Sequence, residues 1–342
     1  MPYVQEIPSS LNLWEQQTYK AAVENSYIDV INPQSGFEGT KNGSLKFTIA
    51  GNDSFINLFK SYIYLKLKLT GNPLIGTGTS AVNVDTSVSK MGASSLSVIN
   101  NIAHSLFKSV KVKIANQDLT ISDDSYGFKT YIQLLLNSTK ENQETYFRVT
   151  GWAKDEAGNM DALIKTDASS DNGALPVRQK DYFTNDEAIG EFFIKPHVGI
   201  NFLDKCMIPF TDVEFELQRH DNSDFYLMHN APSHGYDIEI MEARYWVQRY
   251  KCQPKFVSDV ETMLSQHNVN YKIKDSYMNN FSIPTGVSNY SNDNLFYSGS
   301  VPERIIFAFV QTNSFNGDSK KNPFNFQHLS IQSFRLMKNG VN

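Results

Sequence analysis

Apolar and polar residues alternate with a period of two along many segments of this chain. In Tyr62–Leu69, for example, the odd-numbered positions from Ile63 onward are all Ile or Leu. This pattern is typical of half-buried strands. The other segments that show it are Leu45–Ile49, Val110–Ile114, Val213–Leu217, Ile238–Ile240, Ala243–Tyr250, Arg304–Val310 and Leu329–Met337. Lysine and glutamate occupy many of the alternate positions, so we expect antiparallel strands with one face in water.

Helical spacing is confined to a few short segments. Tyr126–Leu136 has apolar residues at helical intervals and follows Asp123-Asp124-Ser125, which supplies N-cap chemistry. Phe256–Leu264 repeats the helical spacing, and Leu96–Leu106 is predicted to be a third helix or a turn. Many short strands, few helices and long loops predict an all-β sandwich.

Two long segments interrupt the strand pattern. Gly151–Gly190 is polar and broken by Gly, Pro, Asn and Asp, so we predict a surface excursion there, and Gly71–Leu96 is rich in Gly, Ser and Thr. Both are expected to lie between subunits or on the outer surface. A domain boundary is predicted near residues 220–237, where turn-forming residues cluster.

Residues 101–117 and 325–341 read as two copies of one unit. A shift of 224 positions places Asn101 on Asn325, His104 on His328 and Val110 on Phe334. Upstream, residues 62–67 match residues 304–309 with a shift of 242, and the difference falls in the 71–96 insertion. The order favours a duplicated β-domain over chance similarity. A second copy that stops at residue 342 is expected to lack its last strands or to have them supplied by another chain.

Composition excludes several classes of function. The 342 residues suffice for two cores, and the net charge of −5 comes from interspersed acids and bases, with no basic tract dense enough to follow nucleic acid. The N-terminus does not resemble a signal peptide, and the longest apolar run, Ile305–Val310, is too short to span a membrane. Cys206 and Cys252 fit no metal or redox spacing, which favours reduced thiols in a cytoplasmic or nuclear product.

One group of histidines has the composition of a metal site. His220, His229 and His234 lie within fifteen residues, close to Asp221 and Asp224. The histidine spacings of nine and five place them on no shared helix or strand face, so a polar loop between domains is the favoured interpretation.

Other candidate chemistry is weaker still. Asp123-Asp124 could act as an acid–base pair, but a helix N-terminus explains both acids. Gly76–Ser80 lacks the lysine of a phosphate loop. His104 and His328 could be ligands, but their duplication favours packing. We therefore assign no catalytic, metal-binding or cofactor-binding residue and predict no enzyme activity.

Three segments near the C-terminal end carry specific motifs. Val301–Val310, Ser314–Asp318 and Asn322–Phe326 contain Pro-x-Arg-Ile-Ile, Phe-Asn-Gly-Asp and Asn-Pro-Phe-Asn-Phe. These motifs resemble those of the Maverick (polinton) and adintovirus-type major capsid proteins, of the double-jelly-roll lineage of adenovirus hexon. The other similar segments are Phe55–Leu69, Asn101–Val112, Tyr126–Asn137, and Trp152 together with Gly158–Asp161.

This resemblance implies two antiparallel jelly rolls side by side. The expected organisation is an N-terminal arm over 1–26, a first roll over 27–225, and a second roll over 236–342 that is incomplete in this chain. The Phe-rich loop 313–326 is expected to shape the second roll. The family continues beyond this point to finish its second roll, and it has no catalytic residues to carry over.

The implied function is that of a hexon-like major capsid protein. Three copies would form a pseudo-hexagonal capsomer that tiles an icosahedral shell, with minor capsid or penton proteins as further partners. The protein would be assembled inside the host cell and reside in the virion. The alternatives are a minor or vertex capsid protein with a single roll, and a carbohydrate-binding jelly-roll module; a cupin-like enzyme lacks the paired ligands it would need.

Overall fold

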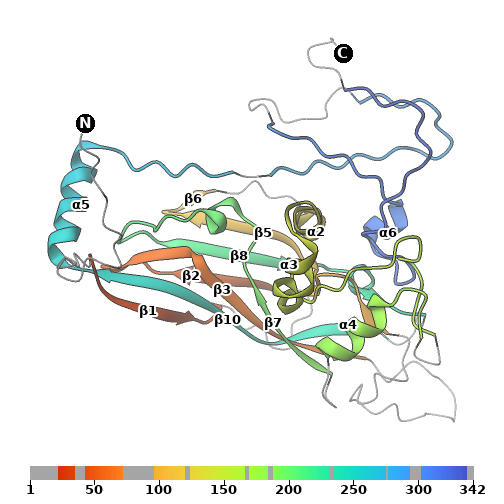
Figure 1. Ribbon diagram of the computed structural model, residues 1–342, viewed down its shortest axis with the longest axis horizontal. Helices are drawn as coiled ribbons and strands as arrows, with labels where there is room; N and C mark the ends of the chain where they lie inside the picture. Colours follow the sequence, from red (N-terminus) through yellow and green to blue (C-terminus); the bar gives the residue numbers. More distant parts are fainter. Residues whose placement is uncertain are drawn as a thin grey trace, which may run out of the picture.

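The computed structural model of the protein describes residues 22–34, 43–71, 96–119, 124–165, 169–183, 188–230, 235–274, 276–292 and 302–336. These residues form a sandwich of two antiparallel sheets with a few short helices (Figure 1), which confirms the predicted all-β class. The elongated sheets lie one over the other, and a long extended segment runs back along them after the last strand.

Each of the two main sheets has four strands. Sheet A has the order β1 (Val23–Ile31), β10 (Asp237–Cys252), β3 (Phe55–Thr70) and β7 (Ile189–Ile194). Sheet B has the order β2 (Ser44–Ile49), β8 (Val213–Arg219), β5 (Phe107–Ile114) and β6 (Gln117–Asp118). A small third sheet pairs β4 (Ser97–Val98) with β9 (Leu227–Met228).

The eight strands of the main sheets pair in a nested order. The first pairs with the last (β1 with β10), the second with the seventh (β2 with β8), the third with the sixth (β3 with β7), and the fourth with the fifth (β5 with β6). A long hairpin wrapped into a sandwich gives this order, which is that of an eight-stranded jelly roll. Residues 23–252 therefore contain every principal strand of one roll.

This topology corrects the predicted boundary between domains. β10 was assigned to a second roll, but it lies in sheet A between β1 and β3 and pairs with both. The last strand of a jelly roll must return beside the first, so the turn-rich residues 221–235 form a loop within the roll. The first roll runs to Cys252 and does not end at residue 225.

The rest of the described chain contains helices α5 (Pro254–Gln266) and α6 (Thr312–Asn316) and, within 254–274, 276–292 and 302–336, no strand. Within the described residues, the segments predicted as strands at 304–310 and 329–336 form no ladder, and Leu329 and Ser330 form a turn with positive φ. They lie together, because the Gln327 amide donates to the Phe309 carbonyl over 2.7 Å and the rings of Phe307 and Phe334 are 4.6 Å apart.

The predicted equivalence of Val110 and Phe334 is therefore not observed. Val110 lies within β5, flanked by β8, and is 7% exposed, whereas Phe334 is 54% exposed and has no strand beside it in the described residues. His104 is likewise buried and His328 exposed. Burial at these positions depends on the neighbouring strands, which the local pattern does not specify.

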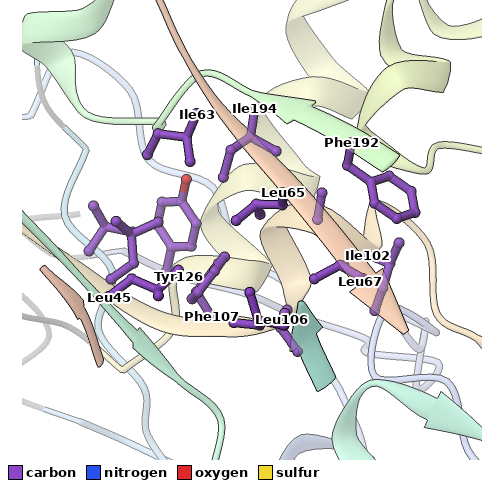
Figure 2. Close-up of a cluster of buried hydrophobic side chains, with 14 of the residues drawn as sticks. Leu45, Ile63, Leu65, Leu67, Ile102, Leu106, Phe107, Tyr126, Phe192 and Ile194 are labelled. Atoms are coloured by element: carbon purple, nitrogen blue, oxygen red, sulfur yellow. The ribbon is translucent and has the colours of Figure 1, made fainter. Parts of the chain in front are cut away.

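The core lies between the two sheets and follows the predicted alternation. Figure 2 shows Ile63, Leu65 and Leu67 of β3 pointing into a cluster with residues of sheet B and the helices. β2 and β8 also bury every second residue. The period-two segments at 45–49, 62–69, 110–114, 213–217 and 238–250 are all strands, which confirms those predictions.

Two of the predicted helices are confirmed. They are α2 (Tyr126–Asn137) and α5; the segment 96–106 divides into β4 and the short helix α1 (Ile102–Ser105). Ser125 is the N-cap residue of α2, but its side chain makes no capping bond; its hydroxyl accepts a hydrogen bond from Asn280 over 2.6 Å.

The predicted surface excursion at 151–190 is wrong for much of its described length. It contains α4 (Ala174–Tyr182), and Trp152, Ile164 and Leu175 belong to the core. Three of its polar residues are buried together, because Arg178 forms an ion pair with Asp155 and Asn172 donates to the same carboxylate. The other predicted loop lies, over residues 72–95, outside the described residues.

Candidate functional site

The C-terminal part of the chain is attached to the first roll in two described segments, 271–280 and 312–326. After α5, the segment 271–280, which we call the strap, crosses the 3₁₀ helix Gly199–Phe202 and reaches α2. The Tyr271 hydroxyl accepts from the Ile208 amide and donates to the Cys206 carbonyl. Gln133 on α2 donates to the Ser276 hydroxyl over 2.6 Å. These bonds hold the strap against α2. Further along the chain, α6 also lies beside α2 (Figure 1), where Phe315 contacts Phe128.

Residues 312–326, which we call the clamp, then pack on α2 through aromatic rings. Phe324 is 1% exposed, and its ring stacks on Tyr131 with centroids 4.1 Å apart and planes 3° from parallel. Phe315 stacks on Phe128 at 5.2 Å, and Phe326 approaches Tyr131 at 6.1 Å. Aromatic pairs at these separations stabilise contacts beyond the area they bury.

The polar residues of the clamp are tied to loops of the first roll. The buried Asn322 donates its amide N–H to Asp161 over 2.8 Å, while its side-chain oxygen accepts from the Phe324 amide. Lys321 pairs with the same Asp161 at 3.3 Å. The carbonyl of Ser319 accepts from the amide of His229. The register of the clamp on the roll is thus set by hydrogen bonds as well as by rings.

Gly317 allows the clamp to approach the roll closely. Its φ is +97°, and a Cβ atom there would lie 2.6 Å from the Asn222 side chain and 3.0 Å from the Phe225 amide nitrogen. Asn222 in turn donates to the carbonyl of Asn316 over 3.2 Å. The Phe-Asn-Gly-Asp motif therefore supplies both the turn and the contact.

These contacts correct the role expected for loop 313–326. It was assigned to the second roll, but it packs on α2, on Asp161 and on the loop that contains Asn222. The aromatic spacing at 315, 324 and 326 is visible in the sequence. Its partners Phe128 and Tyr131 had been interpreted only as the apolar face of a helix, and local pattern does not reveal which faces meet.

A pair of histidines lies under the strap and α2. His104 on α1 hydrogen-bonds through Nδ1 to the Tyr126 hydroxyl at 2.9 Å, and its ring meets the edge of His197 with centroids 5.0 Å apart. The Nδ1 of His197 bonds to Gln133 at 2.9 Å. Burial holds the pKa of His104 well below its usual value and, with the nearby Lys129 and Lys195, lowers the pKa of His197 to about 3. The packing role predicted for His104 is confirmed.

The histidines proposed as a metal site do not converge in the described residues. His220 stacks on Phe225 at 3.9 Å, and burial lowers its pKa to about 4. Nε2 of His229 is 3.5 Å from Asp224. His234, like Gly76–Ser80 and Asp123, lies outside the described residues. Among those that are described, no three His, Cys, Asp or Glu side chains are grouped so as to hold a metal ion.

A second buried ion pair was not predicted from the sequence. Arg219, at the end of β8, binds Asp237, at the start of β10, and the Tyr226 hydroxyl donates to the same carboxylate. This pair closes the loop that had been mistaken for a domain linker. Cys206 and Cys252 carry free thiols, as predicted. None of the helices in the described ranges is long and apolar enough to cross a membrane.

No protein-family model matches this chain. An uncharacterized protein of Caenorhabditis elegans is 21% identical to it over 323 residues, covering 93% of this chain and 70% of the relative.

Several solved structures are also similar to it. The Faustovirus major capsid protein is 10% identical with a TM-score of 0.44, covering 74% of this chain and 58% of that one. The mavirus major capsid protein is 8% identical with a TM-score of 0.38, covering 75% and 53%. A chain of the Sputnik virophage is 11% identical with a TM-score of 0.43, covering 74% and 53%. This chain spans about half the length of these virus structures.

Proposed function

We propose that the protein is a structural capsid protein of the double-jelly-roll kind. Three copies would form a pseudo-hexagonal capsomer, and capsomers would tile an icosahedral shell together with minor capsid or penton proteins. The protein would act by assembly, without catalysis, and reside in the virion.

The observation that carries this proposal is the clamp. The capsid-like motifs at 314–318 and 322–326 are the residues that seat α6 and Phe324 on the first roll. A second roll attached through such a seat would be held rigidly beside the first, which a capsomer requires. The nested strand order of residues 23–252 supports the jelly-roll half of the proposal directly.

A single-roll minor or vertex capsid protein is the second candidate. It is favoured by the presence of one complete roll and of no further strand in the described residues beyond Cys252. The two candidates predict different symmetry, because a vertex of an icosahedral shell is fivefold and a capsomer built from three double rolls is threefold.

Negative-stain imaging of the purified protein distinguishes them. Triangular or hexagonal particles are expected from the double-roll proposal. Pentagonal particles would support the single-roll candidate instead, and a field of compact single chains at every concentration would contradict both.

A further inference from the structure

A continuous band of apolar side chains crosses the outer face of sheet A. On this face, Trp246 of β10 stacks on Tyr64 of β3 at 6.2 Å, and Phe193 of β7 lies 5.3 Å from Tyr64 and 5.5 Å from Trp246. Val30 of β1 pairs with Trp246 across the sheet edge. We call this band the belt; its residues are Ile28, Val30, Tyr62, Tyr64, Phe193 and Trp246.

The belt is exposed at its β1 edge, where Ile28 is 57% and Val30 48% exposed, and its rings on β3, β7 and β10 are half-buried. Beyond the sheet it continues to Phe202, which is 50% exposed. The Lys195 amine bridges the belt to Phe202, because it lies 5.8 Å from the Tyr62 ring centroid and 5.7 Å from that of Phe202. Apolar surface of this extent, rimmed by polar groups, marks interaction sites on soluble proteins.

The size of the belt suits the centre of a protein interface. Four strands spaced about 4.8 Å apart give a width of about 19 Å, and residues 62–68 of β3 rise about 20 Å. The belt together with the charged positions 66 and 68 therefore has a footprint on the order of 400 Å², of which the apolar belt covers the part at residues 62–64. Trp, Tyr and Arg, which dominate the energetics of interfaces, are all present, with Arg244 in register with Tyr64.

The charges beside the belt identify the partner. Glu242, Lys66 and Glu191 stand in register across three strands, and Glu239 is opposite Lys68 on the next row. Acidic and basic side chains alternate on this face. A partner of a single charge sign, such as a nucleic acid or an anionic membrane, would therefore be repelled by the side chains of the same sign. A second copy turned about a two-fold axis that runs parallel to the strands, between β10 and β3, would have its Glu242 opposite Lys66 and its Glu239 opposite Lys68.

We propose that the belt is a homotypic interface, which packs against the belt of a second copy of this chain about a two-fold axis. The inference rests on the proposed function, since a shell of repeated capsomers places neighbouring copies in such pairs. The outer face of sheet A would then form the contact between neighbouring capsomers.

Two surface substitutions test the apolar part. Ile28→Glu and Val30→Asp lie on an edge strand, are about half exposed, and leave the core unchanged. Each is expected to weaken the two-copy contact at least tenfold by sedimentation equilibrium, while Met263→Glu on α5, 59% exposed, leaves it unchanged. Wild-type association by both belt variants would overturn the proposal.

Charge reversal tests the two-fold geometry without touching the apolar band. One variant combines Lys66→Glu with Lys68→Glu, and the other combines Glu239→Lys with Glu242→Lys. Each is expected to lose self-association, and an equimolar mixture is expected to regain it as mixed pairs. Failure of the mixture to associate, with both variants folded by circular dichroism, would exclude the belt-to-belt contact.

The belt interface and the proposed capsid function can fail separately. If capsomers form by imaging and both belt variants still associate as the wild type does, the surface assignment is wrong and the capsid function stands. If the wild-type protein is a single chain under all conditions, the proposed function is wrong.

Discussion

Phe324 links two parts of the chain that are far apart in sequence. Its ring lies flat on Tyr131, and Asn322 beside it is fully buried with its backbone N–H bonded to Asp161. Neither contact belongs to the sheets. At the scale of single residues, the attachment of the C-terminal segment therefore depends on a few side chains that can be tested one at a time.

Replacing Phe324 by Ala should destabilise the protein by about 3–5 kcal/mol, the usual cost of removing a buried aromatic ring. The free energy of unfolding, measured by urea titration, checks this. The matched control is Phe334→Ala, whose ring is 54% exposed and whose loss should change stability by about 0.5 kcal/mol or less. Equal effects of the two variants would contradict the clamp.

Gly317→Ala should destabilise the clamp by more than Gly158→Ala. Both glycines have positive φ, +97° and +86°, so the backbone cost is shared. Only at Gly317 does the new Cβ atom meet other atoms, at 2.6 Å from Asn222, whereas at Gly158 nothing lies within 4 Å. The difference in urea midpoint measures this close approach. If Gly158→Ala were the more harmful, the packing at Gly317 would be wrong.

Acid should destabilise the protein through its buried histidines. The pKa of His197 is lowered to about 3 and that of His220 to about 4, so the folded state keeps both neutral while the unfolded chain binds protons below about pH 6.5. Above pH 6.5 neither histidine lowers the free energy of unfolding. As the pH drops from 6.5 toward the pKa of each histidine in the folded state, the free energy of unfolding falls by about 1.4 kcal/mol per pH unit for each histidine.

Urea unfolding of the wild type and of His197→Gln at pH 8, 6 and 5 measures this effect. The variant should lose less stability than the wild type between pH 8 and pH 5. A wild-type slope that the substitution leaves unchanged would show that His197 does not contribute.

At the scale of elements, period-two patterning was a reliable guide to the strands of the first roll. Segments such as 45–49 and 213–217 became strands because each has one face on the core. The partner of each strand was not predictable in the same way. We predicted that β10 belongs to a second roll, because Asn, Pro and Gly residues precede it. The local sequence does not indicate that β10 returns to lie between β1 and β3.

Polar composition was a poor guide to exposure in the segment 151–190. Asp155 and Arg178 look like surface residues in the sequence, yet both are buried and satisfy one another. Whether an ion pair is buried depends on the residues packed around it in three dimensions, and the spacing of the two residues in the sequence does not indicate this.

Removing one partner of this pair should therefore be costly. Asp155→Ala leaves the Arg178 guanidinium buried without its carboxylate and should destabilise the protein by about 3–5 kcal/mol. Asp171→Ala is the control, because the Asp171 pair with Lys165 is exposed and contributes about 0–1 kcal/mol. Thermal unfolding of the two variants measures the difference, and similar melting temperatures would show that the Arg178 pair is not buried.

At the scale of the whole molecule, the sequence motifs indicated the class of fold, but not how the C-terminal segment is attached. The repeat implied two equivalent rolls; the described residues contain one complete roll, with the clamp seated on α2. Val110 and Phe334 share a local pattern and differ in burial, because only Val110 has strands around it. Tertiary contacts, which are non-local, account for this difference.

We propose that this chain functions by assembling with copies of itself in threes. The mass of the purified protein in solution, measured by native mass spectrometry and by sedimentation equilibrium, tests this proposal most directly. We expect a species of three times the 38.7 kDa chain, together with larger species built from it. A single-chain mass that persists as the concentration rises would contradict the proposal.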